Sequence, residues 1–206
     1  MYSMNDRPGF LRAAIALEGA LILIGIILAW LFPLADSEGL VATLREDFRG
    51  ANLGWGVLAT IPLGLLFLIT YRFPVGPLKQ IRTFLENALG PVLRNCRWYH
   101  LLLVAALAGF CEEFLFRAVL QPRLGLVGSN VLFALAHFIT PTYALLAGLL
   151  GAYLGMVFDF SGYWSAAIAH TLYDWLAFSV IAATLPHAAE ESSPTGETGE
   201  ETFSSP

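Results

Sequence analysis

The chain has 206 residues, of which 57% are hydrophobic and only 13% are charged. Soluble domains carry about 25% charged residues, so this composition argues against a water-soluble domain and indicates an integral membrane protein. The net charge of −5, without a basic patch interleaved with aromatic residues, argues against a nucleic-acid-binding protein.

Six apolar segments are long enough, or nearly so, to cross a hydrocarbon core of about 30 Å as helices. In chain order they cover residues 10–32, 55–73, 98–120, 126–140, 143–160 and 163–185. The fourth and fifth are the shortest, and a Pro-Thr turn joins them. The sequence therefore predicts an all-α, polytopic membrane protein with about six transmembrane helices in contact with the lipid bilayer.

The segment between the second and third helices has apolar residues at helical spacing, with Lys79, Arg82 and Glu86 elsewhere on the wheel. This pattern predicts an amphipathic helix, either on the membrane surface or as a packed connector. The acidic end of the chain, rich in Ser, Thr, Gly and Pro, is predicted to be disordered. The expected parts are residues 1–97 (two helices and the connector), 98–186 (a four-helix catalytic core) and 187–206 (the tail).

The placement of Lys and Arg predicts the orientation in the membrane. Arg7 and Arg12 precede the first helix, and five basic residues lie in the loop between the second and third helices. Because cytoplasmic loops carry an excess of these residues, we expect the N-terminus and that loop in the cytoplasm. Six crossings then return the C-terminus to the cytoplasm.

Ionisable side chains are concentrated in the last four predicted helices. These residues are Glu112, Glu113, Arg117, His137, His170 and Asp174. Each ionisable group costs about 2.5–3.5 kcal/mol at the bilayer centre on insertion scales, so the cluster predicts a functional site. Glu18, in the first helix, is one more such group, and the sequence leaves its role unassigned.

Helix geometry places four of these groups at similar depth, counted from the loop of residues 121–125 that is predicted to join the third and fourth helices. Glu112 lies about 14 Å from that face, and His137 about 17 Å. His170 lies about 11 Å deep and Asp174 about 17 Å deep, and their spacing of four residues lets both point into one cavity. Residues far apart in the sequence are therefore expected to form one site.

Spacing within the third helix indicates which carboxylate faces the others. Glu113 and Arg117 are four residues apart, so they are expected to pair with each other. Glu112 is rotated by about 100° from Glu113 and is free to face His137 and His170. Glu113 and Arg117 are therefore expected to support the site rather than to react.

A carboxylate beside two histidines in a wet intramembrane pocket points to hydrolysis. Glu112 can act as a general base toward water and then pass the proton to a leaving amine. His170 and Asp174 can hydrogen-bond to an oxyanion or orient the site. Alternatively, Glu112, His137, His170 and Asp174 could hold a Zn²⁺ ion with an open coordination position. The residues alone leave the metal-free and zinc-dependent mechanisms open.

Three motifs occur in a fixed order on successive predicted helices. They are E-E-x-x-x-R at residues 112–117, F-x-x-x-H at 133–137 and H-x-x-x-D at 170–174. In this order they resemble the CPBP family, which comprises the type II CAAX prenyl proteases, the bacterial Abi proteins and bacteriocin-processing enzymes. The resemblance covers about residues 98–185. It implies an intramembrane endopeptidase with a peptide or protein substrate, in a bacterial or archaeal inner membrane.

The resemblance also implies roles by motif position. Glu112 would activate water with the assistance of His137, whereas His170 and Asp174 would stabilise the oxyanion or the site. One position departs from the family pattern, because the prenyl-protein proteases typically carry Asn where this chain has Asp174. An ionised Asp cannot donate a hydrogen bond, so Asp174 is expected to orient His170 or bind metal if it is ionised.

Two other function classes fit part of the sequence. A small proton-coupled transporter could use the same Glu, Asp and His residues as a proton relay, but no internal repeat is visible. A catalytically silent immunity or scaffold protein of the same fold would keep its effect when Glu112 is changed.

Overall fold

The computed structural model describes residues 7–34, 40, 44 and 50–184, and every regular element in this part of the chain is a helix. In chain order the elements are α1 (Arg7–Leu31), α3 (Gly50–Arg72), α4 (Pro77–Ala88), α5 (Gly90–Arg94), α6 (Trp98–Glu113), the π-helical segment η1 (Phe114–Leu120), α7 (Gln121–Ala136), α8 (Pro141–Ser161) and α9 (Tyr163–Thr184). The all-α prediction is confirmed for these residues. The predicted disordered tail lies outside them.

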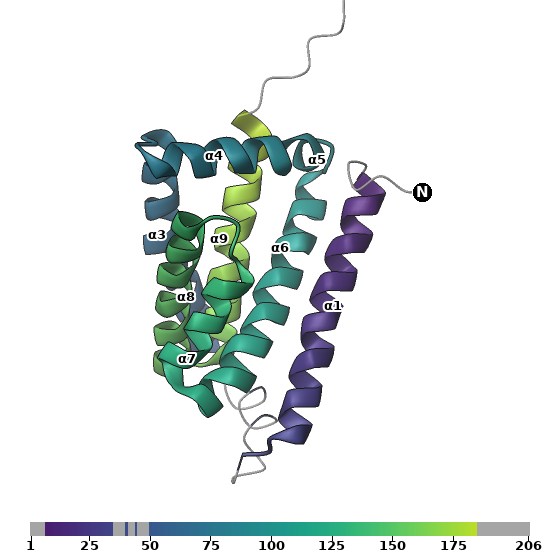
Figure 1. Cartoon of the computed structure of the whole chain (residues 1–206), viewed down its shortest axis with the longest axis vertical. Helices are drawn as coiled ribbons and strands as arrows, with labels where there is room; N and C mark the ends of the chain where they lie inside the picture. Colours follow the sequence, from purple (N-terminus) through teal and green to yellow (C-terminus); the bar gives the residue numbers. More distant parts are fainter. Residues whose placement is uncertain (1–6, 35–39, 41–43, 45–49, 185–206) are drawn as a thin grey trace, which may run out of the picture.

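The long helices form a bundle around α9, which packs against α6, α3 and α8 (Figure 1). The N-terminal end of α1, the C-terminal end of α9 and the helix α4 lie at the same end of this bundle (Figure 1). Large apolar side chains face outward, among them Leu17, Trp30 and Phe160, which are 63%, 78% and 73% exposed. An apolar exterior of this kind suits a lipid environment.

Within the part of the chain that the structure describes, four helices are long and apolar enough to cross a membrane, judged by length and composition. They are residues Arg7–Leu31, Asn52–Arg72, Pro141–Ser161 and Tyr163–Thr184, and they correspond to the first, second, fifth and sixth predicted segments. The third predicted segment is found as α6 and η1, which follow one another without a gap. Membrane spanning is thus supported for four of the six predicted helices, and the count of six stays a prediction.

The boundaries predicted for the fourth helix were wrong at both ends. Residues 121–124 are helical rather than a loop, and the chain changes direction at Gly125, whose φ of 72° favours glycine. The helix ends at Ala136, so that His137 lies just beyond it with φ −98° and ψ 19°. It cannot continue through Thr140, because the residue before a proline avoids the helical conformation and Thr140 is extended ahead of Pro141.

The amphipathic connector is found as α4 and α5. In Figure 1, α4 crosses the end of the bundle at a steep angle to the long helices. Arg82 on α4 bonds to Glu86 at 2.8 Å and to the backbone carbonyl of Tyr71 at 2.9 Å, and the Tyr71 hydroxyl donates to Glu86 at 2.7 Å. Burial alone would raise the pKa of Glu86, but the hydrogen bonds from Arg82 and Tyr71 and the charge of Arg82 hold it below its usual value. These hydrogen bonds join α4 to α3, as expected of a connector that packs against the bundle.

Helices α6 and α9 approach closely at Gly109. A Cβ atom added there would lie 2.7 Å from the backbone nitrogen of Thr171 and 2.8 Å from the carbonyl oxygen of Ala167. Both atoms belong to the α9 backbone, which cannot move aside as a flexible side chain can. Gly109 therefore allows a close helix approach, and this contact sets the spacing between the helices that carry Glu112 and His170.

We predict that Gly109→Ala destabilises the protein by about 1–3 kcal/mol, because the added methyl group forces α6 and α9 apart. The matched control is Gly54→Ala on α3, where an added Cβ meets nothing within 4 Å. It should be neutral or slightly stabilising, since Ala is the better helix former. Thermal unfolding in detergent measures both variants. Equal unfolding temperatures for the two would contradict the predicted close contact.

Candidate active site

A cavity of about 430 Å³ lies within the bundle, and Glu112, His137, His170 and Asp174 all line it. These residues come from α6, the end of α7 and α9. The remaining lining is mostly aliphatic and aromatic and comes from α1 and from all the helices α3 to α9. The tertiary structure therefore brings together, in one largely apolar chamber, the four residues that the sequence analysis nominated as catalytic.

Glu113 and Arg117 form a fully buried ion pair behind the cavity. The Arg117 Nε lies 3.1 Å from Glu113 Oε2, and both side chains are 0% exposed. The expected pairing is thus confirmed. The Arg117 guanidinium also lies over the ring of Phe133, 5.1 Å from its centroid. Glu113 ends α6 and Arg117 lies in the π-helical segment η1, a type of helix that is uncommon and often found at functional sites.

Glu113 has a second partner that the sequence analysis missed. Its other oxygen, Oε1, lies 2.9 Å from Nδ1 of His170 on α9. Because Glu113 is paired with a guanidinium, it acts as an ionised acceptor, so Nδ1 of His170 carries the donated proton. This bond fixes the orientation of the imidazole and leaves Nε2 facing the cavity. Asp174, which was expected to orient His170 or to bind metal, lies 3.5 Å from the other ring nitrogen, Nε2.

Glu112 is the carboxylate that faces the histidines. Its Oε2 lies 3.6 Å from Nε2 of His137 and 4.0 Å from Nε2 of His170. Both distances exceed those of a direct hydrogen bond. Oε2 is buried and has no hydrogen-bond partner. A buried carboxylate oxygen without a partner is costly, so its position between two imidazoles indicates a binding point for a donor.

The backbone determines the tautomer of His137. Its Nδ1 lies 2.9 Å from the carbonyl oxygen of Phe133, which can only accept, so Nδ1 carries a proton. In the neutral ring, Nε2 is then an acceptor directed at Glu112. Two acceptors 3.6 Å apart repel each other unless a hydrogen-bond donor lies between them. A water molecule is the smallest species that can donate to both atoms.

The metal-ligand hypothesis finds no support in the geometry. Among the residues that the structure describes, no group of three or more His, Cys, Asp or Glu side chains is placed to hold a metal ion. The four ligands proposed from the sequence, Glu112, His137, His170 and Asp174, are thus not placed as a metal site either. Their interatomic contacts instead resemble a hydrogen-bonded arrangement in which each imidazole has a separate oxygen partner.

A second polar group lies behind Arg117. Gln121 donates to the carbonyl of Gly155 at 3.1 Å and to Asp159 Oδ1 at 2.7 Å. A Cβ at Gly155 would come within 2.8 Å of Gln121 Oε1, and one at Gly151 would lie 3.2 Å from the Arg117 guanidinium. Gly151 and Gly155 of α8 therefore make room for buried polar side chains.

Comparison with known proteins identifies a related domain. Residues 94–176 match the family model described as "Type II CAAX prenyl endopeptidase Rce1-like". Searches of curated proteins and of solved structures give no match to this chain. The matched region contains all six clustered residues and excludes α1 and α3, and it confirms the resemblance inferred from the three motifs.

We predict that Arg117→Met destabilises the protein by about 3–5 kcal/mol, because it leaves the Glu113 carboxylate buried without a cation. The double variant Arg117→Met/Glu113→Gln should recover more than half of this loss, since the amide keeps an acceptor for His170 and carries no charge. Thermal unfolding in detergent provides the comparison.

The control is Arg82→Met, which breaks the other i,i+4 pair in a partly exposed position. Exposed pairs contribute about 0–1 kcal/mol, so its effect should be much smaller. If Arg117→Met and Arg82→Met were equally destabilising, the buried pair would not have the structural role assigned to it.

Proposed function

We propose that the protein is a CAAX-type intramembrane endopeptidase that hydrolyses a peptide bond in a membrane-associated or exported protein or peptide. The observation that carries this proposal is the unpartnered Oε2 of Glu112, directed at the Nε2 atoms of His137 and His170 inside an apolar cavity. The match of residues 94–176 to an endopeptidase family supports the same reaction class. The long apolar helices support an integral membrane location.

In the first step, Glu112 acts as the general base. A water molecule bound between Glu112 and His137 donates one hydrogen to each. Glu112 takes the proton as the water oxygen attacks the scissile carbonyl carbon, and His137 holds the remaining hydrogen and so orients the attacking oxygen. The fixed Nδ1–H of His137, bonded to the Phe133 carbonyl, keeps Nε2 as the acceptor in this step.

In the second step, the tetrahedral intermediate collapses. Its oxyanion is stabilised by a proton on Nε2 of His170, which faces the cavity. Because Nδ1 already donates to Glu113, His170 acts in this step as a doubly protonated imidazolium whose charge is offset by the carboxylates of Glu113 and Asp174. The C–N bond then breaks, and protonated Glu112 returns its proton to the leaving amine. Asp174, 3.5 Å from the same Nε2, acts as an acceptor that helps to position His170 and its proton.

The lining of the cavity indicates the kind of substrate. Apart from the polar cluster and from Glu18, Thr70 and Arg82, it consists of Leu, Ile, Val, Ala, Phe and Tyr side chains. Leu78, Ile81 and Leu85 of α4 contribute to it at the end of the bundle. An apolar segment or a lipid-modified tail beside the scissile bond would be desolvated favourably there. The family description names CAAX prenyl endopeptidases, and a prenylated tail is one substrate with these properties.

We also propose the finer membrane arrangement, with six crossings and both termini in the cytoplasm. Support comes from the position of the α1 N-terminal end, of α4 and of the α9 C-terminal end at one end of the bundle (Figure 1). The basic residues near α4 favour that end as the cytoplasmic one, in a bacterial or archaeal inner membrane.

Replacement of Glu112 by Gln should lower kcat for a quenched peptide substrate by about 10²–10⁴-fold, because the amide cannot accept the proton of water. The control is Asp159→Asn, the same chemical change near the end of α8, which should leave the rate unchanged. Purified proteins in detergent are compared under identical conditions. A Glu112→Gln protein that cleaves at the wild-type rate would remove Glu112 from the mechanism and favour a silent scaffold or a contaminating protease.

Chelation should leave the cleavage rate unchanged, because the donor atoms do not converge on a metal site. The measurement is peptide cleavage after incubation with EDTA and with 1,10-phenanthroline, followed by addition of Zn²⁺. Loss of activity that Zn²⁺ restores would establish metal dependence and replace the water-activation step described above.

A further inference from the structure

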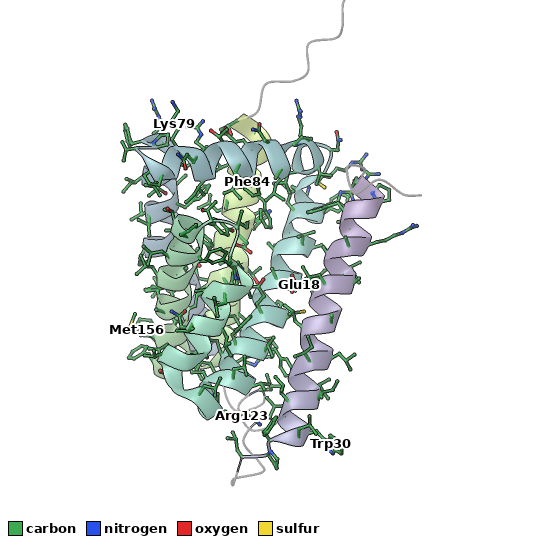
Figure 2. All side chains as sticks on the ribbon, viewed as in Figure 1. Glu18, Trp30, Lys79, Phe84, Arg123 and Met156 are labelled. Carbon is green, nitrogen blue, oxygen red and sulfur yellow. The ribbon has the colours of Figure 1, made fainter. Side chains whose placement is uncertain are left out.

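Glu18 is a buried carboxylate on the outermost helix of the bundle. Only Glu18 and Gly25 are buried in α1, although the helix is otherwise apolar. The neighbouring Leu17 is 63% exposed, whereas Glu18 is 7% exposed. Figure 2 shows Glu18 about halfway along α1, between α1 and α6. The helix therefore turns its one acidic side chain toward the interior, while the adjacent Leu17 faces outward.

Glu18 lies in the same cavity as the proposed catalytic residues. It interacts electrostatically with Glu112, His170 and Asp174. Its Oε2 atom is buried and has no hydrogen-bond partner. A carboxylate oxygen without a partner, directed into a cavity that holds a proposed active site, indicates a place for a donor that the protein itself does not supply.

The charges in the cavity are not balanced. Glu18, Glu112 and Asp174 all line it, and Arg82 is the one lining residue with a permanent positive charge among those described. Arg82 is already paired with Glu86 on α4. The imidazolium of His170 and the guanidinium of Arg117 are offset by Glu113 and Asp174, and the neutral ring of His137 bonds to the Phe133 carbonyl. Glu18 and Glu112 are left without a cation. The cavity is thus suited to a ligand that carries positive charge.

We propose that Glu18 binds a cationic group of the substrate, a lysine or arginine side chain close to the scissile bond. In the proposed mechanism Glu112 activates water and Asp174 positions His170. Glu18 has no role in that mechanism. The inference rests on the proposed endopeptidase function and adds a substrate class to it: apolar segments with a basic residue near the cleavage point. Because a low-dielectric site penalises an unpaired carboxylate, the paired cation is favoured over a neutral side chain of similar shape.

The experiment uses matched quenched peptides in which one Lys is moved through the positions on either side of the cleaved bond. Each Lys peptide has a partner with norleucine at the same position. Wild type should prefer Lys at one position by about 10-fold or more in kcat/KM. In Glu18→Gln the ratio of kcat/KM for the Lys peptide to kcat/KM for the norleucine peptide should fall to about one. Glu18→Asp should keep part of the preference.

Several results would overturn the inference while leaving the endopeptidase intact. The first is a wild-type protein that cleaves the Lys and norleucine peptides equally well at every position. The second is a preference for the Lys peptide that is unchanged in Glu18→Gln. The third is an equal loss of cleavage for both peptides in that variant. If wild type cleaves no better than Glu112→Gln, the proposed function fails and the inference fails with it.

A second measurement uses only the wild-type protein, so its result does not depend on whether a variant folds. A Lys peptide with a reduced, uncleavable bond should inhibit wild type about 10-fold better than its norleucine partner. Equal inhibition by the two peptides would overturn the inference.

Discussion

The buried Glu113 carboxylate is the constraint on which the site depends. It accepts from Arg117 on η1 through one oxygen and from His170 on α9 through the other. A fully buried charge is tolerated only when it is paired and hydrogen-bonded, so these three side chains must adopt this arrangement together. The bond to Nδ1 then determines the direction of Nε2 of His170, which faces Glu112. A residue that does not touch the substrate thus determines where an imidazole proton is available.

Small residues on the packed helices make this arrangement sterically possible. Gly109 lets α6 approach the α9 backbone, and Gly151 leaves room for the Arg117 guanidinium. In a membrane, where apolar burial does not drive helices together, close packing of small residues is a main source of association. Here the same positions also create the space for buried polar groups. Helix packing and the placement of charge are therefore coupled, and a methyl group added to either glycine acts on both.

The site draws on more of the chain than the region that matches the endopeptidase family. Residues 94–176 supply the cluster of carboxylates, histidines and arginine. The earlier helices contribute much of the cavity around it: Leu63 and Phe67 from α3, Leu78 and Ile81 from α4, and Glu18 from α1. An apolar enclosure strengthens electrostatic interactions and limits the entry of water. Chemistry is thus concentrated in the second half of the chain, whereas the shape and charge of the chamber also depend on the first half.

The sequence by itself determined the helical class, the approximate positions of most long helices and the pairing of Glu113 with Arg117, because hydrophobic run length and i,i+4 spacing are local properties. Counting residues along the helices also placed Glu112, His137, His170 and Asp174 at similar depths. Rotation and distance between helices are not local, so only the tertiary structure decided that Glu113 lies beside Nδ1 of His170 and Asp174 beside Nε2. It also decided that Glu18 faces the cavity: its depth in α1 was visible, but the side of the helix that meets α6 depends on packing between distant segments.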